Sequence, residues 1–61
     1  MNPFKVDYTN LVQVKEFADS MAARDGIKYI VYKHPSRNNY NITFDSRLDQ
    51  YCNCVVVHRT N

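Results

Sequence analysis

Hydrophobic and polar residues alternate in two well-separated stretches of this sequence, residues 4–8 and residues 40–44. Alternation with a period of two is typical of a strand that buries one face and leaves the other to solvent. The first stretch therefore predicts a short N-terminal strand. The second predicts a strand with one dry face and one wet face.

Between these stretches, apolar residues recur at steps of three and four, which is the spacing of one helix face. The positions are Leu11, Val14, Phe17, Ala18, Met21 and Ala22. Thr9 or Asn10 can cap the first turn, and Gln13 stands in the capping-box position three residues after Asn10. Gly26 can supply the left-handed residue that ends a helix. One amphipathic helix is expected between these caps.

Two further segments, residues 27–33 and 52–59, carry apolar or aromatic side chains on both faces and are expected as strands. A turn over residues 34–39 joins the first of them to residues 40–44. Residues 45–49 are expected as a capped helical turn with Leu48 inward. The order β-α-β-β-β predicts a small single α+β domain over residues 1–61. One amphipathic helix packs on one face of a three- to four-stranded, mainly antiparallel sheet.

A single helix covers only one face of such a sheet, so the other face is expected to be open. The favoured register sends Ile27, Tyr29, Val31, Tyr40, Ile42 and Phe44 under the helix. It sends Lys28, Ile30, Tyr32 and His34 to the open face, beside Asn41 and Thr43. In the last strand, Val55 and Val57 would be buried and Cys54, Val56 and His58 would point outward. The alternative registers exchange these sets.

The open face is the predicted binding site, because an apolar centre with an aromatic and cationic rim is typical of protein interfaces. The predicted partner-binding residues are Lys28, Ile30, Tyr32, His34, Arg37, Val56 and His58. The expected function is non-catalytic binding of a protein partner, or self-association as a homodimer. Pairing along an unpaired edge strand is an alternative geometry. Another interpretation is the ordinary scatter of exposed apolar atoms that every protein has.

Binding of single-stranded nucleic acid is the main competing function. Four tyrosines lie among basic residues in the second half of the chain, at Tyr29, Tyr32, Tyr40 and Tyr51. Sheet-borne aromatic rings with basic neighbours can stack unpaired bases. However, the net charge is only +2, which does not amount to a concentrated basic footprint.

A zinc-stabilised fold is a second alternative, with Cys52, Cys54, His34 and His58 as the candidate ligands. The one-residue gap between the cysteines is poor for a zinc knuckle, so no metal site and no cofactor are predicted. A domain of 61 residues has little room for a substrate pocket. Neither an enzyme nor a small-molecule substrate is therefore expected.

The N-terminus has no apolar signal core, and no run of apolar residues is long enough to span a membrane. Two cysteines in such a chain favour a reducing cytoplasm. Met1 and the polar end lead us to expect a complete small gene product. In size and style, though in no motif, the chain is similar to the short accessory proteins that phages make to bind and modulate or inhibit a host protein. That likeness implies the host cytoplasm.

Overall fold

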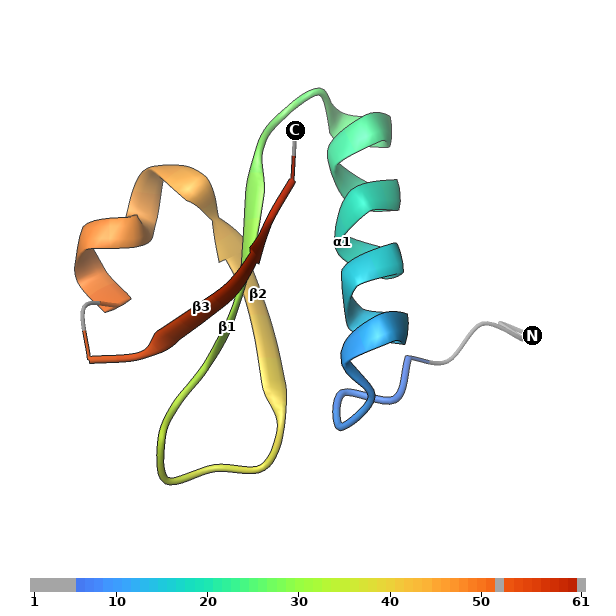
Figure 1. Ribbon diagram of the computed structural model, residues 1–61. Helices are drawn as coiled ribbons and strands as arrows, with labels where there is room; N and C mark the ends of the chain where they lie inside the picture. Colours follow the sequence, from blue (N-terminus) through green and yellow to red (C-terminus); the bar gives the residue numbers. More distant parts are fainter. Residues whose placement is uncertain (1–5, 52, 61) are drawn as a thin grey trace.

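A three-stranded antiparallel sheet with one long helix forms the framework of the protein, and the computed structural model describes residues 6–51 and 53–60. The elements follow in the order α1 (Leu11–Asp25), β1 (Tyr29–Lys33), β2 (Tyr40–Phe44), the 3₁₀ helix η1 (Asp45–Tyr51) and β3 (Val55–Arg59). The strand order is β2-β1-β3. Helix α1 lies on one side of the sheet and η1 on the other (Figure 1). The α+β class with one helix on an antiparallel sheet is thus confirmed.

Helix α1 begins and ends at the predicted caps. The Asn10 side chain accepts a hydrogen bond from the backbone N–H of Gln13, and Gly26 adopts φ = 69°. The Gln13 side chain accepts from the backbone N–H of Asp7, which ties the preceding turn to the helix. Within the described part of the chain, no helix has the length and apolar character needed to cross a membrane.

The hairpin of β1 and β2 has the favoured register, with Val31 opposite Ile42 and Tyr32 opposite Asn41. Because facing residues in an antiparallel pair point to the same side, Val31 and Ile42 both lie under α1. There Val31 packs with Val14 and Ala18, all three without solvent exposure. Strand β1 begins at Tyr29, two residues later than predicted. Ile27 therefore precedes the sheet and is 45% exposed.

The expectation that Ile30 is exposed on the face opposite α1 is wrong. Ile30 does point to that face, since it neighbours Val31 in the strand, yet its side chain has no exposed surface. Helix η1 packs against β1 and β2 on this side (Figure 1), with Leu48 half-buried. The predicted helical turn therefore exists but is longer than expected, and it covers the apolar centre of the face.

Strand β3 contains a bulge that changes which of its residues face the helix. Val31 is opposite His58 and Tyr32 is opposite Val56, with a register shift between the two pairs. The extra residue places both Val57 and His58 on the α1 side. The outward orientation predicted for His58 is therefore wrong, while those of Val56 and Val57 are confirmed. Val55 is 55% exposed rather than buried, because it lies on an edge strand with few contacts to α1.

The predicted N-terminal strand is not confirmed, and neither is the β-α-β-β-β order. Phe4 and Lys5 lie outside the described residues, and Val6–Tyr8 is not a strand. Val6 still packs against the core beneath α1, as the alternation predicted. The carbonyl of Tyr8 accepts a hydrogen bond of 2.8 Å from the backbone N–H of Tyr40. This contact joins residues 6–8 to the first residue of β2.

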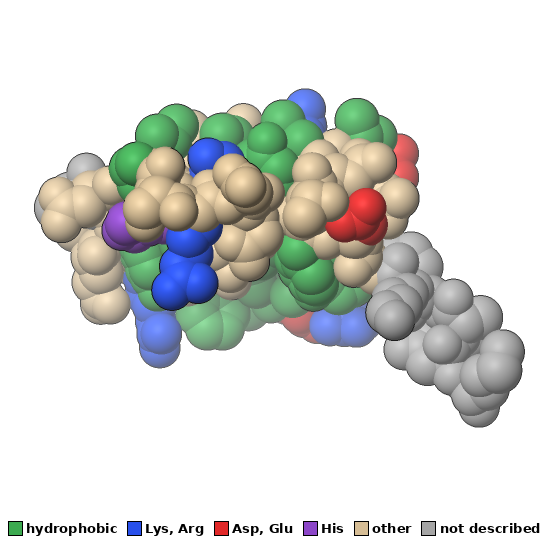
Figure 2. Space-filling view, turned by 90° about the horizontal axis from the view of Figure 1, so that it is seen from below, with side chains coloured by type: hydrophobic (Ala, Val, Ile, Leu, Met, Phe, Trp, Pro, Cys, Tyr) green, Lys and Arg blue, Asp and Glu red, His purple; other side chains and the backbone are tan. Residues whose placement is uncertain are grey.

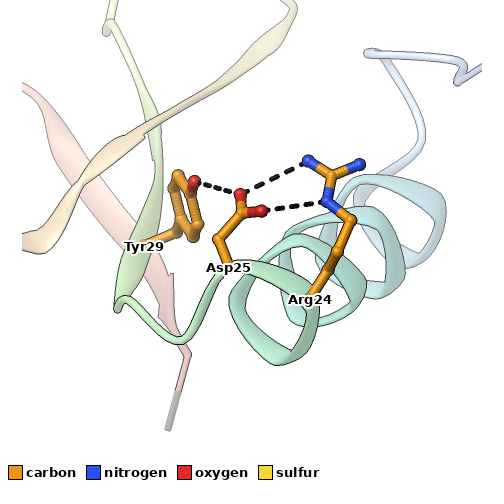
Figure 3. Close-up of polar contacts among 3 residues, drawn as sticks. All are labelled: Arg24, Asp25 and Tyr29. Carbon is orange, nitrogen blue, oxygen red and sulfur yellow. Dashed lines mark hydrogen bonds and ion pairs between the residues drawn. The ribbon is translucent and has the colours of Figure 1, made fainter.

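A polar cluster joins the end of α1 to the start of β1 (Figure 3). The Tyr29 hydroxyl donates to Asp25 at 2.8 Å, and the Arg24 guanidinium donates to the same carboxylate at 2.9 Å. The hydrogen bonds from Arg24 and then from Tyr29 lower the pKa of Asp25. The backbone N–H of Tyr29 donates to the Thr60 hydroxyl at 2.8 Å. The residues of this cluster thus bind one another.

Candidate binding groove

A groove of about 360 Å³ lies on the face opposite α1, beyond the part of the sheet that η1 covers. Its walls come from the end of β1, the β1–β2 loop, β2, the end of η1 and the segment before β3. The side chains that define it are Tyr32, His34, Arg37, Asn41, Tyr51 and Cys54. Gln50 and Asn53 complete the lining. We refer to this hollow as the groove.

Two tyrosines form one wall of the groove. The rings of Tyr32 and Tyr51 lie 4.4 Å apart between centroids, at an interplanar angle of 39°. Burial of the ring raises the pKa of the Tyr32 hydroxyl, and the neighbouring Tyr51 and Cys54 side chains raise it further. The hydroxyl is therefore neutral and can donate a hydrogen bond at neutral pH. Packing of the two rings on each other fixes this wall in position.

The β1–β2 loop forms another part of the lining and begins with a tight turn. The backbone N–H of Arg37 donates to the carbonyl of His34 at 3.0 Å, and Pro35 occupies the second position, where its fixed φ suits a turn. The backbone N–H of Ser36 donates to His34 Nδ1 at 3.2 Å. Because Nδ1 is an acceptor here, the neutral ring carries its proton on Nε2.

Arg37 differs from the other arginines because its guanidinium has no partner among the described residues. The other three arginines each have a partner: Arg24 binds Asp25, Arg59 binds Asp45, and Arg47 lies over the ring of Phe44. Among residues 6–51 and 53–60, Arg37 has no ion pair, and no carboxylate belongs to the groove lining. Figure 2 views the end of the molecule that carries this loop, where a histidine lies beside basic side chains.

Three of the seven predicted partner-binding residues meet at the groove, namely Tyr32, His34 and Arg37. The other four lie elsewhere. Ile30 is fully buried on the side of β1 where η1 packs, and Val56 is half-buried opposite Tyr32. Lys28 is exposed but precedes β1 at the far end of the strand from the loop. The predicted apolar docking face is thus replaced by a smaller and more polar hollow.

His58 lines a second hollow, of about 300 Å³, between α1 and β3. Its Nε2 lies 2.8 Å from Asp19 Oδ1, which joins β3 to the helix. Arg59, also in the lining, binds Asp45 at 2.9 Å. The side chains of His58 and Arg59 in this second hollow therefore link elements of the fold to one another.

The three candidate zinc ligands that the structure describes do not meet at one place. His34 and Cys54 both line the groove, whereas His58 lies on the opposite face and contacts Asp19. Cys52 is outside the described residues. Within the described part of the chain, no group of three or more histidine, cysteine or acidic side chains could hold a metal ion.

The predicted partner-binding residues did not include the groove residues from β2 or from the segment between η1 and β3, although Cys54 was expected to point outward. The alternation over residues 40–44 places Asn41 on the correct face, but nothing in the sequence marks it as part of a site. Tyr51 is one of several tyrosines in the chain, and its position two residues before a turn gives no sign that it packs against Tyr32.

Comparisons with known proteins found no matching family model, no matching curated protein and no matching solved structure.

Proposed function

We propose that the protein is a small non-catalytic binding module whose groove receives a segment of a partner protein. The observation that carries this proposal is that Arg37, which has no ion pair among the described residues, lines the same groove as the packed rings of Tyr32 and Tyr51. Tyrosine and arginine are the side chains that contribute most to binding energy at protein interfaces. A binding role also fits the chemistry of His34, whose Nδ1 is engaged by Ser36 rather than poised as a catalytic base.

A library of random linear peptides, panned against the purified protein, provides a direct test. Enriched peptides would be synthesised and titrated into ¹⁵N-labelled protein. We expect the largest amide shifts at Tyr32, His34 and Tyr51, because these residues line the groove. Shifts confined to α1, or no enrichment at all, would count against the proposal.

A matched pair of variants separates the groove from the rest of the surface. Asn41→Tyr places a large side chain in the groove, and we expect peptide affinity to fall about tenfold or more. Val12→Gln changes an exposed residue on the helix side, which is 63% exposed, and should leave affinity unchanged. Equal affinities for the two variants would contradict binding in the groove.

Homodimer formation, the phage-type modulating role and a cytoplasmic setting stay predictions from the sequence. Light scattering over a range of protein concentrations tests the first of them. A concentration-dependent rise to twice the 7.2 kDa mass of the chain would support self-association. The Asn41→Tyr variant would then show whether the groove takes part in that contact.

Single-stranded nucleic acid is the second candidate occupant, favoured by the ring pair beside Arg37. It ranks lower because the rings of Tyr32 and Tyr51 already pack against each other, with centroids 4.4 Å apart, which occupies ring surface that a base would need. Titration of a labelled oligothymidine at low and moderate salt decides between the two. Binding that weakens steeply with salt and disappears in Arg37→Ala would favour nucleic acid.

A further inference from the structure

We infer that the segment received by the groove carries a side-chain carboxylate, from Glu or Asp, that binds Arg37. This inference rests on the proposed function and names the chemistry of the partner. Its basis is charge complementarity: a permanent cation lies at a groove whose described lining contains no acid. A guanidinium can bind a carboxylate through two parallel hydrogen bonds, which gives direction as well as strength.

Two arginines elsewhere in the fold have the carboxylate partner that Arg37 lacks among the described residues. Arg24 and Arg59 are each satisfied by an aspartate within 2.9 Å. Arg37 has no such carboxylate among the described residues, although it stands at a hollow with polar walls. A partner carboxylate would supply the missing ion, and His34, whose Nδ1 is an acceptor, would offer a hydrogen bond from its Nε2–H.

A side chain fits this position better than the carboxylate at the end of a partner chain. Capture of a chain terminus relies on successive backbone N–H groups that are free to donate. Two successive N–H groups of this loop are already engaged, since Ser36 N–H donates to His34 Nδ1 and Arg37 N–H donates to the His34 carbonyl. The Arg37 guanidinium is the one permanently cationic group among the residues that line the groove, so we assign the anion to it.

The tyrosine pair that lines the groove together with Arg37 defines the rest of the segment. An apolar or aromatic residue beside the acid would pack on the exposed edges of Tyr32 and Tyr51. A carboxylate with one negative charge also matches the single fixed positive charge of the groove. The segment is thus expected to combine one acidic residue with one apolar neighbour.

The test uses the synthetic peptides enriched by panning, each made in three forms. One form is unchanged, one has every Glu and Asp replaced by Gln and Asn, and one has an amidated C-terminus. We expect the neutralised form to bind the wild-type protein about tenfold or more weakly. The amidated form should bind as tightly as the unchanged peptide.

Two arginine variants provide the matched control. Arg37→Gln should remove the difference between the acidic and neutralised peptides. Arg47→Gln removes an arginine that lies over the Phe44 ring, outside the groove lining, and should preserve that difference. Raised salt should weaken the acidic peptide more than the neutralised one.

The carboxylate and the binding function can fail separately in these experiments. Peptides that shift groove amides but bind equally in acidic and neutralised forms would overturn the carboxylate and leave the binding function standing. Loss of affinity on amidation alone would instead assign the site to a chain terminus and overturn the inference. Absence of any groove-binding peptide would remove both proposals.

Discussion

The two ends of β1 differ in how completely the fold satisfies their side chains. At the closed end, Tyr29 is 6% exposed and Ile30 has no exposed surface. The polar groups there bind Asp25 and Thr60. At the open end, Tyr32 borders the groove, and the nearby guanidinium of Arg37 has no described carboxylate partner.

This difference indicates that a polar cluster points to a binding site only when one of its charged groups has no partner within the fold. Both ends hold a tyrosine and an arginine, so residue types alone do not separate them. The cluster of Arg24, Asp25 and Tyr29 closes on itself (Figure 3), which assigns it to stability. At the groove, the charge of Arg37 has no such carboxylate among the described residues, so an outside group would have to supply the anion.

The largest expected effect is on stability at the closed end. Ile30→Ala should lower the free energy of unfolding by about 2–5 kcal/mol, because it empties a fully buried site beneath η1. Val56→Ala, at a half-buried site on the same face beside Tyr32, should cost about 1 kcal/mol. Urea unfolding measures both. If Ile30→Ala folds too poorly to measure, Ile30→Val should still lower the free energy of unfolding by about 0.5–1.5 kcal/mol. Similar small losses for the Ile30 and Val56 variants would show that η1 does not bury this end of the sheet.

A smaller effect is expected from the hydroxyl that caps the start of β1. Thr60→Val keeps the shape of a side chain that is 6% exposed but removes the acceptor of the Tyr29 backbone N–H. An unsatisfied buried donor costs about 1–3 kcal/mol. Ser36→Ala, which removes an exposed hydroxyl from the loop at the open end, should change stability by less than about 0.5 kcal/mol. Equal costs would mean that the two ends are equally constrained by polar contacts.

Acid sensitivity should also follow the closed end. Hydrogen bonds from Arg24 and Tyr29 lower the pKa of Asp25 from its ordinary value of 3.8. The stability that this ionised carboxylate contributes is therefore present above that value and is lost as the pH falls through the lowered one. Unfolding free energies measured from about pH 5 to about pH 2 should fall less steeply in Asp25→Asn, by a fraction of one proton. An unchanged slope would show that these contacts do not favour the ionised carboxylate.

The sequence predicted the helix and the hairpin well because their signals are local. Asn10 and Gly26 cap α1 through backbone geometry that nearby residues set, and the alternation over residues 40–44 fixes the register with β1. The bulge that turns His58 toward Asp19 depends on how β3 meets β1, and no glycine marks it. The course of η1 across the sheet is also a tertiary property, so the burial of Ile30 could not be predicted from local pattern.

The same limit applies to the candidate site. Tyr32 and His34 were predicted because alternation along the strand put them on the open face, and Arg37 was predicted as a cation at the rim of that face; all three line the groove. Tyr51 and Cys54 reach the groove only because η1 folds back over the sheet. Which arginine lacks a partner depends on where all four lie in three dimensions, and local sequence does not determine that.

The most direct test compares the dissociation constant of one groove-selected peptide for the wild-type protein and for Arg37→Ala. Urea unfolding first establishes that the two proteins are equally stable, within about 0.5 kcal/mol. We predict that Arg37→Ala binds the peptide about tenfold or more weakly. An unchanged dissociation constant, or a loss of stability that accounts for the weaker binding, would contradict the assignment of the open end to partner recognition.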